Sequence, residues 1–160
     1  MELGPELRRA LVMTATAMAG AQDDWWVIGS AAAVLHGASL GEIADIDVML
    51  SVADARRILP GLGVALTPGV ADQRFRSEFY CQWTSPPVPV DFMAGFTAHG
   101  APLVPATREA ITIGEQILFV PAKDELIAIL QFFGRPKDLE RARLLEAWRI
   151  GLSSSSPASP

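Results

Sequence analysis

The sequence has only one cysteine, Cys81, among its 160 residues. A single thiol excludes an intramolecular disulfide and a cysteine-based metal cluster, and it is typical of proteins in a reducing compartment. No apolar run is long enough to span a membrane. The apolar stretch after Arg8 and Arg9 has the outline of a signal peptide, but Glu2 and Glu6 offset both arginines, which favours an ordinary first helix. We therefore expect a cytoplasmic protein.

Positive charge is scarce as well, since 13 Lys and Arg stand against 18 Asp and Glu, for a net charge of -5. This surplus of acid excludes a general affinity for nucleic acids and other polyanions. One local cluster is basic, and it comprises Arg135, Lys137, Arg141, Arg143 and Arg149. A solvated helix face is the ordinary interpretation of such a cluster, and a local contact with phosphates is the alternative.

Apolar residues are abundant: half of the chain is hydrophobic and 19% is charged. Disordered chains have the opposite bias, so this composition predicts a folded core. The length suits one domain. We assign residues 1–152 to that domain and the Ser/Pro-rich residues 153–160 to a flexible tail.

Hydrophobic periodicity and Gly/Pro breaks predict an α+β fold, in which a mixed β-sheet is flanked by helices and the domain ends in two helices. Helices are expected from Pro5 to Met18, from an N-cap at Ser30 to Gly37, from Asp54 to Pro60, over 121–134 and over 136–148. Strands are expected near 25–28, 45–52, 64–66, 74–83 and 88–93, followed by a loop over 94–106 and a hairpin around Gly114.

Two carboxylates, Asp45 and Asp47, open the apolar strand "DIDVML". Residues two apart on a strand share a face and lie roughly 6–7 Å apart, so both can hold one divalent cation. A third acid, Asp91, lies within the apolar strand "PVPVDFM". If the two strands are neighbours, the three carboxylates converge and repel one another unless a cation neutralises them. Hard oxygen ligands favour Mg²⁺ or Mn²⁺ over zinc. The alternative is three unrelated acids at strand edges.

A Gly-Ser pair, Gly29 and Ser30, separates the first strand from the following helix. Glycine allows close approach to the backbone, and a helix start presents unpaired N–H groups that suit a phosphate. The Ser30 hydroxyl is a further donor. Read alone, the pair is an ordinary helix cap, and its interest lies in its combination with the three acids.

The combined pattern, "VIGSAAAVLHG", then "DIDVML", then "VDF", resembles the nucleotidyltransferase superfamily, whose fold is that of DNA polymerase beta. In that superfamily a Gly-Ser turn binds a nucleoside triphosphate, for example ATP, and a D-x-D pair with a third acid binds magnesium. The resemblance implies Gly29 and Ser30 as triphosphate-binding residues. It also implies Asp45, Asp47 and Asp91 as the catalytic, metal-binding residues.

The Leu-His-Gly end of the second helix and the closing "DELIAILQFFGRPKDLERARLL" are similar to the small bacterial AbiEii-like branch, which is known from toxin-antitoxin systems. The sequence departs from that branch in three places. Leu130 stands near the usual lysine, Arg141 stands where an acid often follows Asp138, and "LGEIA" replaces an Arg/Thr-rich approach to D-x-D. These departures leave the metal ligands intact. They fall at positions that concern nucleotide or acceptor binding, and therefore catalysis.

The resemblance implies transfer of a nucleoside monophosphate from a magnesium-bound NTP to an acceptor, with release of pyrophosphate. The acceptor, whether RNA, a protein or a small molecule, is left open. A haloacid dehalogenase-like phosphatase also uses D-x-D, but there the pair ends its strand, whereas here the apolar residues follow it. The alternative of another class is a catalytically inactive binding module, for example a toxin-antitoxin component with a partner protein.

Overall fold

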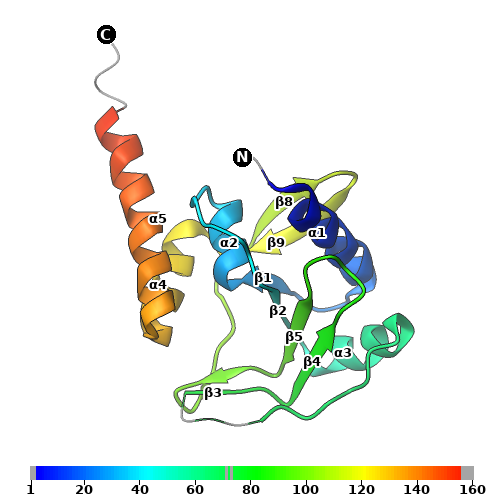
Figure 1. Cartoon of the computed structure of the whole chain (residues 1–160). Helices are drawn as coiled ribbons and strands as arrows, with labels where there is room; N and C mark the ends of the chain where they lie inside the picture. The colour runs from blue at the N-terminus through cyan, green and yellow to red at the C-terminus, as the bar shows by residue number, and fades with distance from the viewer. Residues whose placement is uncertain (1–2, 71, 73, 156–160) are drawn as a thin grey trace.

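The structure, a computed structural model, describes residues 3–70, 72 and 74–155, with side chains up to residue 147. A four-stranded sheet lies at its centre, and helices and a two-stranded hairpin pack around it (Figure 1). Helices α4 and α5 pack against each other at one side of this sheet. None of the described helices is long and apolar enough to cross a membrane.

The central sheet contains four strands, which lie in the order β1 (Trp26–Ile28), β2 (Ile46–Leu50), β5 (Val90–Ala94) and β4 (Phe79–Trp83). The two middle strands, β2 and β5, are parallel, and both outer pairs are antiparallel. The sheet is therefore mixed, and the predicted α+β class is confirmed. The parallel pairing of β2 with β5 also meets the condition under which Asp45, Asp47 and Asp91 were expected to converge.

Alternation along β2 and β5 divides their side chains between two faces of the sheet. One face packs into the main core through Ile46, Val48, Leu50, Val90, Phe92 and Ala94. The opposite face carries Met49 and Met93, which belong to a smaller apolar cluster with Phe96 and Phe133. Asp47 and Asp91 alternate with the main-core residues, so they lie on this second face, beside the smaller cluster.

The helices are α1 (Pro5–Ala17), α2 (Gly29–Leu35), α3 (Val52–Ile58), α4 (Lys123–Phe133) and α5 (Pro136–Ser155), with 3₁₀ turns η1 (Met18–Gly20) and η2 (Leu59–Leu62). Local chemistry sets several boundaries. Pro5 and Pro136 open their helices, where a missing N–H costs nothing. Ser51 caps α3 by accepting a hydrogen bond from the Asp54 N–H. Gly134, at φ +74°, ends α4 in the left-handed region.

The remaining strands lie outside the central sheet. Strands β8 (Glu109–Ile113) and β9 (Gln116–Val120) form the predicted hairpin around Gly114. A small three-stranded sheet contains β3 (Phe75–Arg76), β6 (Thr97–Ala98) and β7 (Ala101–Pro102). Two of these short strands interrupt the segment 94–106, which was predicted as loop throughout.

Several predicted boundaries are wrong. Residues 64–66 form no strand, because the Val64 N–H donates to the Leu59 carbonyl and completes the preceding turn instead. The predicted strand over 74–83 is two strands, β3 and β4. Helix α2 begins at Gly29 and ends at Leu35, so Ile28 and not Ser30 is the N-cap residue. Helix α5 runs to Ser155, and residues 156–160 lie outside the described residues, so the division into a domain and a tail stays a prediction.

Candidate functional site

Three aspartates converge on the second face of the central sheet. Asp47 and Asp91 are direct partners in the parallel register of β2 and β5, and Asp45 immediately precedes β2. One carboxylate oxygen from each residue lies within 4.8 Å of the other two. The structure thus brings together all three acids that the sequence singled out.

Burial and mutual repulsion disfavour the charged forms of these acids. Burial, followed by the negative charges of Asp45 and Asp91, raises the pKa of Asp47 to about 7. Burial and the Asp91 charge likewise raise the pKa of Asp45. Three crowded carboxylates form a hard oxygen donor set, which suits Mg²⁺ or Mn²⁺. The residues present therefore fit a divalent cation.

The N-terminal end of α2 lies directly against this cluster. Gly29 has φ +69°, a conformation that favours glycine. A Cβ at this position would lie 2.7 Å from Oδ2 of Asp47, so glycine is also required for space. Ser30 follows, is buried, and lines the same cavity as the aspartates. Gly29 and Ser30, the first residues of α2, are therefore adjacent to the acids in space, and Gly29 packs on Asp47.

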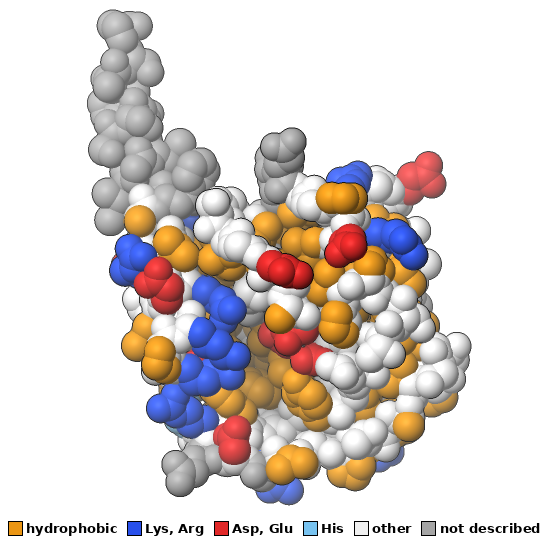
Figure 2. Space-filling model, viewed as in Figure 1, with side chains coloured by type: hydrophobic (Ala, Val, Ile, Leu, Met, Phe, Trp, Pro, Cys, Tyr) orange, Lys and Arg blue, Asp and Glu red, His pale blue; other side chains and the backbone are white. Residues whose placement is uncertain are grey.

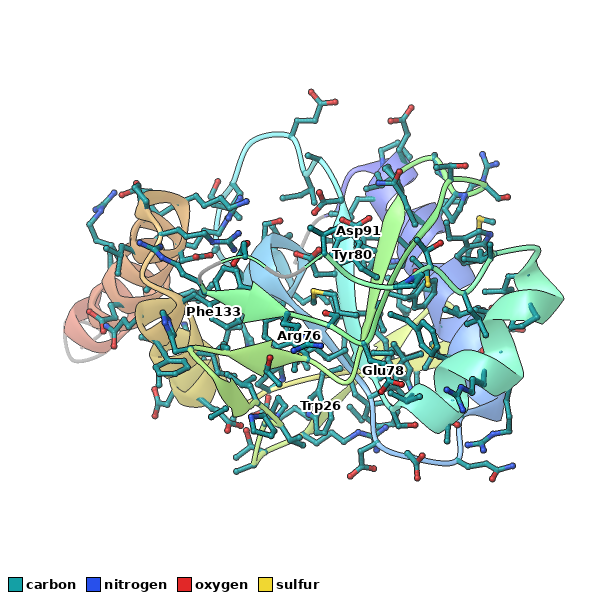
Figure 3. The ribbon with its side chains drawn as sticks, turned by 90° about the horizontal axis from the view of Figure 1, so that it is seen from below. Trp26, Arg76, Glu78, Tyr80, Asp91 and Phe133 are labelled. Atoms are coloured by element: carbon teal, nitrogen blue, oxygen red, sulfur yellow. The ribbon has the colours of Figure 1, made fainter. Side chains whose placement is uncertain are left out.

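Two side chains of β4 hold Asp91, and sequence reasoning missed both. The Tyr80 hydroxyl donates a hydrogen bond to Oδ2 of Asp91 at 2.7 Å, and Nε2 of Gln82 donates to Oδ1 at 3.1 Å. Figure 3 shows Tyr80 beside Asp91. Burial, together with this hydrogen bond, raises the pKa of Tyr80. The phenol therefore stays protonated as a donor, and Asp91 has a partner at each oxygen.

The cluster opens into a cavity of about 370 Å³. One wall is acidic, and the opposite wall carries three cations from the start of α5 and the residue before it: Arg135, Lys137 and Arg141. Apolar side chains line the cavity between them, namely Ile28, Phe75, Met93, Phe96 and Phe133. Figure 2 shows the same arrangement, with blue side chains on one side of a hollow whose centre is red. The cavity thus separates opposite charges across an apolar surface.

The cations of this wall differ in their partners. Arg135 donates two hydrogen bonds to Asp138, at 2.6 and 3.1 Å, and lies over the Phe75 ring at 4.8 Å. Lys137 and Arg141 have no carboxylate within 4.0 Å among the residues whose side chains are described. Both nevertheless lower the pKa of Asp45 across the cavity. Two cations that face an acidic cluster without bonding to it leave room for an anion between them.

The members of the basic cluster lie in two places. Three of them line the cavity, although Lys137 is exposed, and their contact with phosphates stays a prediction. Arg143 lies on a solvated face, where it pairs with Glu140. The side chain of Arg149 lies outside the described side chains. The sequence did contain a signal for this shared position. Lys137 and Arg141 are four residues apart, which puts both on one face of a helix.

The fold is that of solved nucleotidyltransferase structures. The chain is similar to a candidate nucleotidyltransferase from Thermotoga maritima, with a TM-score of 0.68, 19% sequence identity and 96% of each chain covered. It is also similar to the antibiotic-resistance factor ANT(2″)-Ia, with a TM-score of 0.57, 14% identity and coverage of 96% of this chain and 95% of that one.

A second structure of ANT(2″)-Ia, in complex with adenylyl-2″-tobramycin, matches with a TM-score of 0.53 and 14% identity over 91% of this chain and 97% of that one. No protein-family profile matches the sequence, and no curated protein sequence matches it. At these identities the likeness establishes the fold, and it does not distinguish an AbiEii-like branch.

Proposed function

We propose that this protein transfers a nucleoside monophosphate from an NTP to an acceptor group and releases pyrophosphate. The observation that carries the proposal is the cavity itself. Three carboxylates with oxygens within 4.8 Å of one another form one wall, and Lys137 and Arg141 face them from the other. An NTP with a bound divalent cation has the charges to fill this space, since its phosphates match the basic wall and its cation matches the acids.

Each predicted site residue has a place in this proposal. Asp45 and Asp47 would hold Mg²⁺ or Mn²⁺, and the cation would supply neutralisation of charge on the phosphates. The Gly29–Ser30 turn would approach the β- and γ-phosphates, because glycine leaves the backbone accessible beside Asp47. Asp91 would share the cation site and accept the proton of the attacking group. Tyr80 and Gln82 fix the orientation of Asp91 for this task.

The acceptor is a separate question from the transfer. ANT(2″)-Ia was solved with adenylyl-2″-tobramycin. In the present chain both acidic and basic side chains line the cavity, so its charge does not select among RNA, protein and small-molecule acceptors.

A binding module without catalysis is the second candidate, and Leu130 favours it. This residue, at the position of the usual lysine, is fully buried and cannot reach a phosphate. Under this hypothesis the protein would be a toxin-antitoxin component that binds a partner protein. Purification with a stoichiometric partner and no nucleotide turnover would support it.

Titration calorimetry with Mg²⁺ and each of the four NTPs tests the enzymatic proposal. The wild type should bind at least one NTP, and the double variant Asp45→Ala/Asp47→Ala should not. Glu6→Ala removes an exposed acid on α1, so it controls for a change in net charge alone. Labelled NTPs in a cell lysate would then identify the fraction that accepts the label. Equal binding by the wild type and the double variant would contradict the proposal.

A further inference from the structure

The Tyr80 hydroxyl already contacts the carboxylate that the proposed mechanism uses as its base. It donates a 2.7 Å hydrogen bond to Oδ2 of Asp91, the carboxylate expected to accept the proton of the acceptor. We propose that Tyr80 is itself an acceptor, and that the protein attaches a nucleoside monophosphate to its own tyrosine. This inference rests on the proposed function and adds a modification site to it.

Access to Asp91 supports this assignment. Asp91 is only 4% exposed, and Gln82 occupies its other oxygen. Tyr80 is 43% exposed and lines the cavity, so its hydroxyl can meet both the buried carboxylate and a ligand in the cavity. An acceptor hydroxyl from outside would have to share Oδ2 of Asp91 with Tyr80. The native arrangement therefore supplies a hydroxyl at the base before any other acceptor enters.

The elements that carry Tyr80 hold it in this place. It belongs to β4, which pairs antiparallel with β5 and puts Gln82 opposite Asp91. Tyr80 and Gln82 are two residues apart, so both side chains lie on the face that carries the acids. Because the tyrosine stands on a strand and not on a loop, its hydroxyl is positioned by the sheet itself. Such preorganisation is what an intramolecular reaction requires.

The reaction balances without a further reactant beyond the NTP. The Tyr80 oxygen attacks the α-phosphorus and forms a phosphodiester bond. The bond between the α-phosphorus and the bridging oxygen of the β-phosphate breaks, and pyrophosphate leaves with its electron pair. The phenol proton passes to Asp91. The product is a tyrosine that carries one nucleoside monophosphate inside the cavity, so each molecule reacts once.

Mass spectrometry provides the direct test, because Tyr80 is the only tyrosine in the chain. The protein is incubated with Mg²⁺ and each NTP, and its intact mass is measured under denaturing conditions. We expect an increase of one nucleoside monophosphate, which peptide mapping places on Tyr80. An unmodified protein, or an adduct mapped to any other residue, would overturn the inference. Mapping of the wild type does not depend on whether a variant folds.

Variants sharpen this result. Tyr80→Phe removes only the hydroxyl and should abolish the adduct, and Asp91→Asn should do so by removing the proton acceptor. Ser77→Ala is the matched control, since it removes another buried hydroxyl near the cavity and should leave the adduct unchanged. Thermal denaturation checks that each variant is folded. The modified fraction should grow at a rate independent of protein concentration, and a rate that falls on dilution would contradict transfer within one molecule.

A measurement without nucleotide tests the coupling between Tyr80 and the acids. Mg²⁺ alone should change the near-UV difference spectrum between the wild type and Tyr80→Phe, because the cation and the phenol share Asp91. An unchanged difference spectrum would show that the cation does not affect the Tyr80 hydroxyl. Failure of the proposed function can be told apart from failure of this inference. If the proposed function is wrong, calorimetry detects no NTP binding at all. If NTP binds and label reaches another acceptor while Tyr80 stays unmodified, only this inference fails.

Discussion

Asp47 on β2 and Asp91 on β5 face each other directly in the parallel register of the central sheet. Like charges in such a position destabilise a sheet. Here Tyr80 and Gln82 donate hydrogen bonds to Asp91, while burial and the neighbouring charges raise the pKa of Asp47 to about 7. Binding of either a proton or a cation at this pair should therefore stabilise the native state.

Asp47→Asn should stabilise the metal-free protein at alkaline pH. The native pKa of Asp47, about 7, lies above its ordinary value of 3.8, so between these values the native state binds a proton that the unfolded state has lost. The free energy of unfolding of the wild type should therefore fall as pH rises from about 4 to about 7. The variant lacks this loss, and its Tm at pH 8 should exceed that of the wild type by about 2–4 °C per kcal/mol regained.

Thermal denaturation across this pH range, with and without Mg²⁺, is the measurement. Mg²⁺ should raise the Tm of the wild type at pH 8 and have little effect on the variant, which has lost a ligand. Near pH 4 the advantage of the variant should disappear. A wild type whose stability rises steadily from pH 4 to pH 8 would contradict the raised pKa.

Gly29→Ala should destabilise the protein and disturb the site together. Alanine in the left-handed region costs about 1–2 kcal/mol, and its Cβ would stand 2.7 Å from Oδ2 of Asp47. The Asp47 side chain must then move, which should weaken NTP binding. Gly61→Ala is the matched control, because nothing lies within 4 Å of its added Cβ. Chemical denaturation and calorimetry measure the two effects, and equal behaviour of both variants would be evidence against the close packing.

The acids and the glycine of the site were predictable because their signals are local. An acid inside an apolar strand, or a glycine before a helix, stands out against its immediate neighbours in the sequence. Tyr80 and Gln82 carry no such signal in "FYCQW", because their role depends on β4 pairing with β5 in one particular register. The incorrect strand at 64–66 has the same cause. An apolar segment becomes a strand only if it finds a partner, and Val64 bonds to Leu59 instead.

Leu130→Lys should not restore a phosphate-binding lysine. Leu130 is fully buried on α4, and a charged side chain there would lose its hydration without a partner. We expect a loss of about 3 kcal/mol or more in the free energy of unfolding, with no gain in NTP affinity. Phe132→Lys is the control, since Phe132 lies on the same helix and is half exposed. A stable Leu130→Lys protein that binds NTP more tightly would show that the position faces the site.

Lys137 and Arg141 should supply the positive charge that Leu130 does not. Each lines the cavity opposite the acids and has no carboxylate partner among the described side chains. Replacing either by alanine should raise the Kd for an NTP by about tenfold, the effect of one charge-assisted hydrogen bond, and should also make binding less dependent on salt.

Arg143→Ala removes a cation that already pairs with Glu140 on the exposed surface, so its Kd should match the wild type. Calorimetry at two ionic strengths separates these variants. If all three bound NTP equally, the basic wall would serve the acceptor and not the phosphates, and the labelled product in the lysate should then be lost selectively in the Lys137 and Arg141 variants.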